Sequence, residues 1–141
     1  MEETLSQNKI QQIEESFQKQ GFMSYINARI TQLEKGEVHI ICPYSTNVSQ
    51  QNGFFHAGII TSIADVACGY AALSMMPEGM EILSVEFKVN LLRPAVGSQI
   101  KAVAKVIKSG KKLTVCEGNV YNENEKLVAK MIATMIGTKQ T

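Results

Sequence analysis

The hydrophobic residues near the N-terminus recur at helical spacing. Ile10, Ile13 and Phe17 stand among Gln, Glu and Lys residues, so they fall on one face of a helix and the polar residues on the other. We therefore predict an amphipathic surface helix over roughly residues 3–19, closed by Gly21.

After this helix, apolar and polar residues alternate in several runs, as in strands that bury one face. Two runs, over residues 24–34 and 37–42, are joined by a Lys35-Gly36 turn. Four further runs follow in the second half of the chain, over residues 82–92, 99–108, 112–121 and 126–136. Because the connections between consecutive runs are short, we expect these strands to pair as an antiparallel meander.

The run over residues 82–92 alternates most strictly. Its apolar residues occupy every second position: Leu83, Val85, Phe87, Val89 and Leu91. This pattern predicts a strand with one buried face, with Ser84 on the opposite, polar face.

Between the two groups of strands, residues 57–76 are almost continuously apolar, and Asp65 is their only formal charge. The run is long enough to span a membrane, but a carboxylate near the bilayer centre costs about 2.5–3.5 kcal/mol. A helix buried inside a soluble fold fits better. A flat sheet cannot cover such a helix, so we predict an α+β fold with five to six antiparallel strands wrapped around it. The single domain covers residues 1–141, with residues 1–20 as an N-terminal helical extension.

Composition excludes several classes of function. The net charge of +1 over 141 residues gives no global attraction to nucleic acid or to membranes. The three cysteines, Cys42, Cys68 and Cys116, are isolated, so neither a disulfide framework nor a zinc site is expected. The polar N-terminus lacks the pattern of a signal peptide, which, with the cysteines, predicts a cytoplasmic protein.

The segment QQNGFFHAGIITSIAD carries a motif of six residues at fixed spacing: Gln50, Gly53, His56, Ala57, Gly58 and Asp65. With the order of elements, it resembles the hot-dog fold acyl-CoA thioesterases, in particular the phenylacetate-pathway group and the Arthrobacter-type 4-hydroxybenzoyl-CoA thioesterases. The resemblance covers roughly residues 20–138. There are two departures: Ala57 stands where the family commonly has Gly, and the acid is Asp where the 4-hydroxybenzoyl enzymes use Glu.

Asp65 is the first candidate for chemistry. Burial in an apolar helix disfavours the charged form of a carboxylate and makes it a stronger base, unless donors hold the charge. Such a group suits general-base or nucleophilic work on a thioester carbonyl, and the residues do not decide between these. The alternative is a structural Asp satisfied by backbone amides or by a hidden Lys.

The start of the central helix is the second candidate. If the helix begins near Ala57, the N–H groups of Ala57 and Gly58 have no intrahelical acceptor and form an oxyanion site. The resemblance implies that the amide after His56 is the donor and that His56 supports the site; the alternative is that His56 caps the helix or bonds the loop backbone. Gln50 could orient a water or the carbonyl, or simply be solvated. Ser84 assists in some relatives, or makes a cross-strand polar pair.

His56 and Asp65 cannot act on one substrate atom from a single straight helix. Nine residues at about 100° each leave them on opposite sides, about 13 Å apart along the axis. Either one of them is irrelevant, or the site joins two subunits. The resemblance implies the second, with the acid crossing a dimer interface, so we expect a homodimer at least and a homotetramer as its assembly.

The phosphates of a CoA substrate need local positive charge. The candidates are Arg93 and the turn KSGKK, which comprises Lys108, Ser109, Gly110, Lys111 and Lys112; the alternative is a solvated basic hairpin. The acyl group is expected along the central helix, among side chains that could equally be core: Ile59, Ile63, Met75 and Met76. No metal or redox cofactor is implied.

The sequence is thus interpreted as an acyl-CoA thioesterase that releases a carboxylic acid and CoA. Two rivals remain. A hot-dog dehydratase or hydratase would act on acyl thioesters without releasing the thiol, although those enzymes pair a His and an acid in a different local motif. A non-catalytic acyl-CoA binding module would bind without reaction.

Overall fold

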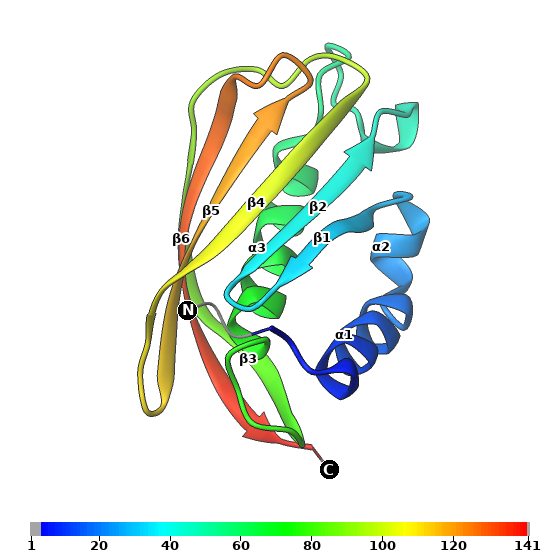
Figure 1. The fold of residues 1–141 in the computed structure, drawn as a ribbon. Coiled ribbons are helices and arrows are strands. Elements are labelled where there is room, and N and C mark those ends of the chain that lie inside the picture. Colours follow the sequence, from blue (N-terminus) through cyan, green and yellow to red (C-terminus); the bar gives the residue numbers. More distant parts are fainter. Residues whose placement is uncertain (1–3, 141) are drawn as a thin grey trace.

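In a computed structural model, which describes residues 4–140, a six-stranded antiparallel sheet curves around one long helix (Figure 1). The elements in chain order are α1 (Gln7–Gln18), α2 (Gly21–Tyr25), β1 (Arg29–Glu34), β2 (Glu37–Pro43), the 3-10 turn η1 (Thr46–Val48), α3 (Ala57–Leu73), β3 (Met80–Leu91), β4 (Gln99–Ser109), β5 (Leu113–Asn122) and β6 (Leu127–Lys139). The predicted α+β architecture is confirmed. Residue 3, where the predicted first helix begins, lies outside the described residues.

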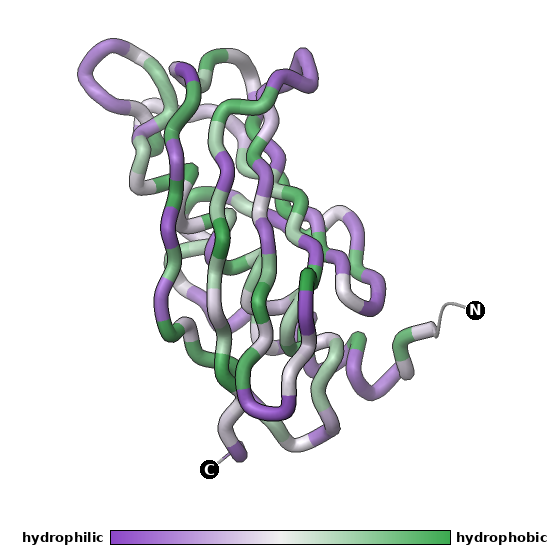
Figure 2. Tube along the Cα trace, turned by 90° about the vertical axis from the view of Figure 1, so that its left-hand side faces the viewer, coloured by the Kyte–Doolittle hydropathy of each residue, from purple (hydrophilic) through white to green (hydrophobic). Residues whose placement is uncertain are grey.

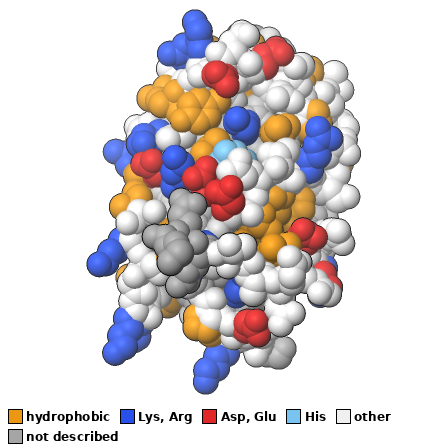
Figure 3. Space-filling view, viewed as in Figure 1, with side chains coloured by type: hydrophobic (Ala, Val, Ile, Leu, Met, Phe, Trp, Pro, Cys, Tyr) orange, Lys and Arg blue, Asp and Glu red, His pale blue; other side chains and the backbone are white. Residues whose placement is uncertain are grey.

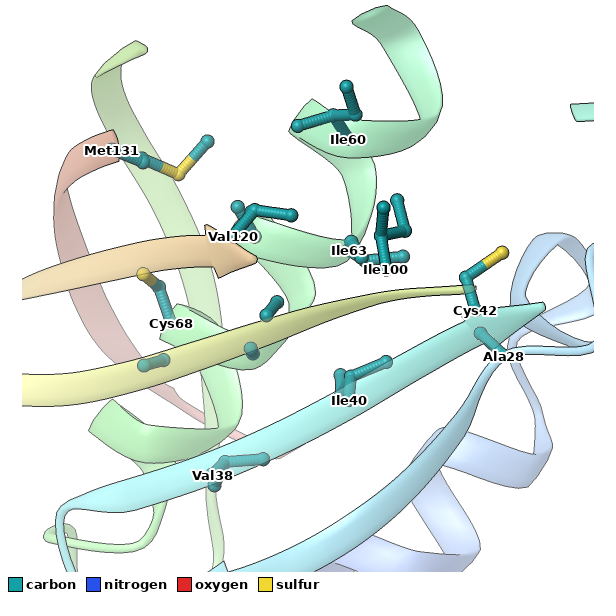
Figure 4. Packing of buried hydrophobic residues seen from close by; sticks show 14 of the residues in the cluster. Ala28, Val38, Ile40, Cys42, Ile60, Ile63, Cys68, Ile100, Val120 and Met131 are labelled. Atoms are coloured by element: carbon teal, nitrogen blue, oxygen red, sulfur yellow. The ribbon is translucent and has the colours of Figure 1, made fainter. Parts of the chain in front are cut away.

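The core lies between α3 and the concave face of the sheet. α3 packs against β2, β3, β4, β5 and β6, and its Ile63, Ala67 and Cys68 are completely buried. Figure 4 shows Ile60, Ile63 and Cys68 of this helix among side chains of the surrounding strands. The strands supply every second residue to this core: β5 alternates between buried and partly exposed positions along most of its length, as expected for a sheet with one covered face.

A glycine allows the closest approach of the helix to the sheet. A Cβ at Gly118 of β5 would lie 2.9 Å from Cys68 Sγ and 3.4 Å from the Ala64 carbonyl oxygen. A side chain at this position would therefore force the Cys68 side chain, or α3 itself, to shift.

The strand order corrects the predicted meander. The order across the sheet is β1-β2-β4-β5-β6-β3, so consecutive pairing holds for β4, β5 and β6 but not for β3, which lies at the edge beside β6. The connection after β3 is too long for a hairpin and crosses the end of the sheet, where Ala95 accepts a hydrogen bond from the Phe55 N–H (3.0 Å) and Ser98 from the Tyr44 N–H (2.8 Å).

A β-bulge in β3 corrects the expectation of one uninterrupted apolar face. Ser84 pairs with Met135 and Phe87 pairs with Ala133, with an irregularity between Ser84 and Glu86. Since Met135 and Ala133 are both completely buried, Ser84 and Phe87 face the same, helix-covered side of the sheet although they are three residues apart. Ser84 is therefore not on the polar, outward face.

The edge position of β3 leaves apolar side chains exposed. Phe87 and Leu91 face the helix side but are 42% and 51% exposed, and Leu83, on the other face, is 58% exposed. Outside this edge, hydrophilic and hydrophobic positions succeed one another along the strands (Figure 2). Lys and Arg side chains are interspersed with Asp and Glu on the face shown in Figure 3.

α1 is attached to the segment that joins α3 to β3. Ile13 is completely buried, the Lys9 ammonium donates to the Pro77 carbonyl (3.2 Å), and the Gln12 amide donates to the Met80 carbonyl (2.7 Å). Burial lowers the pKa of Lys9, against the opposing effect of the nearby Glu78 carboxylate. In the described part of the chain, no helix is both long and apolar enough to cross a membrane.

Replacing Gly118 with Val should lower the free energy of unfolding by about 1–3 kcal/mol, the usual cost of overpacking a core. Val is otherwise favoured in strands, so a loss of stability would come from the contact with α3. Urea denaturation measures it. The matched control is Gly21→Ala, where a Cβ meets nothing within 4 Å; equal stability of wild type and Gly118→Val would contradict the close approach.

Candidate functional site

The segment that precedes α3 is held in a fixed conformation. The His56 N–H donates to the Val48 carbonyl (2.8 Å). The side-chain oxygen of Gln50 accepts from the backbone N–H groups of Asn52 (2.5 Å) and Phe54 (3.1 Å). Gln50 thus organises the loop through its oxygen, while its side-chain NH2 has no partner among residues 4–140. Gly53 has a φ of +82°, a backbone conformation that favours glycine.

His56 is the N-cap of α3. Its Nδ1 accepts a hydrogen bond from the Gly58 N–H (2.8 Å), so the neutral ring carries its proton on Nε2. This is the capping alternative considered from the sequence. The Gly58 N–H, one of the two predicted oxyanion donors, is thereby engaged, whereas the Ala57 N–H has no acceptor in the described part of the chain and lies at the positive end of the helix dipole.

Asp65 lies in the middle of α3 at its boundary with β3. Its Oδ1 accepts a hydrogen bond from Ser84 Oγ (2.7 Å), and the same hydroxyl lies 3.3 Å from Met135 Sδ. In the single protomer Asp65 is only partly buried, less than its apolar surroundings in sequence suggested. The bulge in β3 turns Ser84 toward Asp65, and no signal in the alternating sequence indicated it.

An open cleft of about 740 Å³ runs from this pair along α3, between α1 and the start of β3. Asp65 and Ser84 line it, whereas His56 and Ala57 do not. The carboxylate and the helix start are therefore separated within one protomer, as helical geometry predicted. Sequence reasoning missed the contribution of α1 to this cleft, because only the fold brings α1 and α3 together.

The predicted CoA contacts fall at two ends of the molecule. Arg93 belongs to the connection that bonds the Phe55 backbone near the start of α3. The KSGKK turn lies at the tip of the β4–β5 hairpin, at the opposite end (Figure 1), around a cavity of about 290 Å³ lined also by Met75 and Met76. One protomer does not bring Arg93 and this turn together. Ile59 and Ile63, the other acyl-pocket candidates, belong to the core.

The cysteines are buried thiols. Burial raises the pKa of Cys42 to about 11 and that of Cys116 to about 12, and it raises the pKa of Cys68 further, with the neighbouring Cys116 contributing. All three are free and, because the thiol form dominates at neutral pH, poor nucleophiles. Within residues 4–140, no three His, Cys, Asp or Glu side chains gather as metal ligands would.

A long helix enclosed by a curved six-stranded antiparallel sheet is the hot-dog fold. Residues 52–129 match the sequence model of the thioesterase superfamily. The chain belongs to this superfamily and is a thioester hydrolase.

Individual relatives agree with this assignment. The chain is 30% identical over 129 residues, or 91% of either protein, to "Putative esterase SSO2140" of Saccharolobus solfataricus. It is 27% identical over 96 residues to the medium/long-chain acyl-CoA thioesterase YigI of Escherichia coli, covering 58% of this chain and 62% of that one.

Solved structures extend the agreement to nearly the whole chain. A thioesterase family protein of Silicibacter pomeroyi superposes with a TM-score of 0.90 at 40% identity, covering 94% of this chain and 99% of that one. The PaaI protein of the E. coli phenylacetic acid degradation operon superposes with a TM-score of 0.88 over 98% of this chain and 99% of that one. Because the two sequences are 21% identical, this comparison supports the fold alone.

The capping role of His56 predicts a specific pattern of stabilities. His56→Ala should lower the free energy of unfolding by about 1 kcal/mol, since the Gly58 N–H loses its acceptor. His56→Asn should restore most of the loss, because Asn is a good N-cap. Thermal or urea unfolding of the three proteins checks this; an equal loss in both variants would mean that the cap is not the stabilising contact.

Proposed function

We propose that the protein hydrolyses acyl-CoA thioesters to a carboxylic acid and free CoA, with Asp65 as the catalytic carboxylate. The observation that carries the proposal is the hydrogen bond from Ser84 Oγ to Asp65 Oδ1, which holds one carboxylate oxygen of a residue that lines an open cleft. As a general base, Asp65 would take a proton from water while the water oxygen bonds to the carbonyl carbon. As a nucleophile it would bond that carbon itself. In both cases the C–S bond then breaks and the CoA thiolate leaves. In the nucleophilic case the acyl group remains on Asp65 as a mixed anhydride, and a water molecule must hydrolyse it to release the acid and restore the carboxylate.

The carbonyl oxygen would be stabilised at the start of α3. The Ala57 N–H is the principal donor, because the Gly58 N–H is held by His56. The His56 Nε2–H and the Gln50 side-chain NH2 are further donors of the same exposed region. Charge develops on the carbonyl oxygen in the transition state, where such fixed donors act most strongly.

Asp65 and Ala57 lie too far apart for one protomer to hold both on one thioester, so the active unit is a homodimer with two sites. The support is β3, a long edge strand with exposed apolar side chains beside the site, Phe87 and Leu91; edge strands of this kind pair with another chain. Exposed apolar residues on the outer face suit association of two dimers into a tetramer: Leu83, Ile107, Leu113 and Ile132.

In the proposed dimer, two subunits would share the binding of the CoA phosphates. Arg93 of one subunit and the KSGKK turn of the other would bind the phosphates together, whereas within a single chain they lie at opposite ends. The reaction needs no metal or redox cofactor, and we place it in the cytoplasm, where CoA thioesters are made and used.

Asp65→Asn should reduce thiol release from acyl-CoA by about 10²–10⁴-fold, the usual effect of losing a catalytic acid or base, without loss of substrate binding. Release of CoA is followed with a thiol reagent and binding by calorimetry. The control is Glu86→Gln; the Glu86 carboxylate belongs to β3 and accepts a hydrogen bond from Thr134 (2.6 Å) on the outer face. Undiminished release by Asp65→Asn would remove Asp65 from the mechanism. Binding without release in the wild type, or hydration of an enoyl-CoA instead, would favour a binding module or a hydratase.

Ala57→Pro should reduce thiol release by about 10²-fold or more, since it removes one oxyanion donor. Proline is well tolerated at the first position of a helix, and His56 already has the extended backbone, with φ −64° and ψ 139°, that precedes proline. Ala57→Gly keeps the N–H and is the control.

Mixing the two inactive variants tests the shared site. After subunit exchange, Ala57→Pro and Asp65→Asn should together recover about one quarter of wild-type activity, because half of the dimers then hold one intact site of two. No recovery despite demonstrated exchange would place both groups of a site in one chain.

A further inference from the structure

α1, which lies outside the matched family region, contributes a polar wall to the cleft that contains Asp65. Ser16 of α1 and Gln20, which lies between α1 and α2, line this cleft together with Tyr70 of α3. Tyr70 is 3% exposed, and its hydroxyl bonds Ser16 Oγ (2.9 Å) and accepts from the Gln20 side-chain NH2 (2.7 Å). The ring of Tyr70 is held edge-on against Phe17. The three polar side chains therefore form one fixed cluster, here called the Tyr70 cluster.

The Tyr70 cluster has hydrogen-bonding capacity left over. The hydroxyls of Ser16 and Tyr70 carry two protons, of which their mutual bond uses one, whichever is the donor. The second proton has no acceptor among residues 4–140, and neither does the Gln20 side-chain oxygen have a donor there. One donor and one acceptor are thus available side by side, the complement of a neutral hydroxyl group.

The position of the cluster relative to Asp65 sets the size of the ligand that could use it. Tyr70 follows Asp65 by five residues, about 7.5 Å along the helix axis. Gly69 lies between them in the cleft wall, and the absence of a side chain there keeps the cleft open. A short acyl group whose thioester lies at Asp65 would thus reach the cluster with its far end.

The charges of the cleft favour a neutral polar group over an anionic one. Besides Asp65, three carboxylates line it, from Glu15, Glu78 and Glu81, against the single ammonium of Lys19. An acyl group ending in a carboxylate would be repelled, and a purely apolar chain would leave the donor and acceptor of the cluster without partners.

We propose that the Tyr70 cluster is the specificity determinant of this enzyme and selects short acyl groups that carry a hydroxyl at the end remote from the thioester. This rests on the proposed thioesterase activity at Asp65. Discrimination of this kind is strong where a site is built to hydrogen-bond a hydroxyl, because a substrate without the hydroxyl leaves the buried polar groups of the site without partners.

The test compares butanoyl-, hexanoyl- and octanoyl-CoA with their ω-hydroxy counterparts and with the CoA monothioester of a dicarboxylic acid, by kcat/KM for thiol release. The wild type should prefer the best ω-hydroxy substrate to its unsubstituted match by about tenfold or more, the effect of one hydrogen bond to a buried group. The dicarboxylic substrate should be the poorest. Tyr70→Phe and Ser16→Ala should each reduce the preference about tenfold while changing hydrolysis of the unsubstituted chains far less.

Tyr25→Phe is the matched control, since Tyr25 is 62% exposed on α2 and does not line the cleft. A merely structural role of Tyr70 would slow all substrates alike, leaving the ratio unchanged, and would overturn the inference. The inference would also be overturned if the active wild type showed no ω-hydroxy preference, or if the preference were the same in Tyr70→Phe and Ser16→Ala as in the wild type. Failure of the wild type to release thiol from any acyl-CoA would instead overturn the proposed function itself.

Discussion

α3 carries apolar side chains around most of its circumference, and removing them from water requires a surface that curves. Five strands contact the helix, and the sheet can approach it closely because Gly118 presents only a hydrogen atom where Cys68 lies. The one direction in which the sheet leaves the helix uncovered is the side between β3 and α1. Asp65 lies on that side. The burial of the helix therefore also determines where a carboxylate can meet solvent and substrate.

At the start of α3, one hydrogen bond determines the state of several groups. With the Gly58 N–H bonded to His56 Nδ1, the ring orientation, the tautomer and the identity of the remaining free amide are all settled together. Ala57 in place of the more common Gly keeps this amide and lowers the backbone entropy lost on folding. Capping and a role in the reaction are thus compatible for His56, since they use different nitrogen atoms.

The elements of the fold could be predicted from the sequence because periodicity is local: the alternation of β5 and the apolar run of α3 each identify their own element. The position of β3 could not, because pairing with β6 depends on contacts far apart in the chain. The bulge after Ser84 could not be predicted for a different reason. The apolar and polar residues still alternate in the sequence, but the extra residue turns the side chains that follow it to the opposite face of the sheet. For the candidate site, the motif predicted Gln50, His56 and Asp65, whereas the Tyr70 cluster could not be predicted because only the fold brings Ser16 and Gln20 next to Tyr70.

The bulge also makes the faces of β3 sensitive to the number of residues between Ser84 and Phe87. Two residues stand between Ser84 and Phe87, yet both side chains project from the same face, so the alternation of faces along β3 shifts by one residue between them. Insertion or deletion of a single residue in this stretch would return the strand to one phase. Either Ser84 would leave Asp65, or Phe87 and its neighbours would turn to the opposite face. Insertion or deletion of two residues would keep Ser84 and Phe87 on the same face. The number of residues between them therefore links the hydrogen bond of Asp65 to the face on which the exposed apolar side chains of β3 lie.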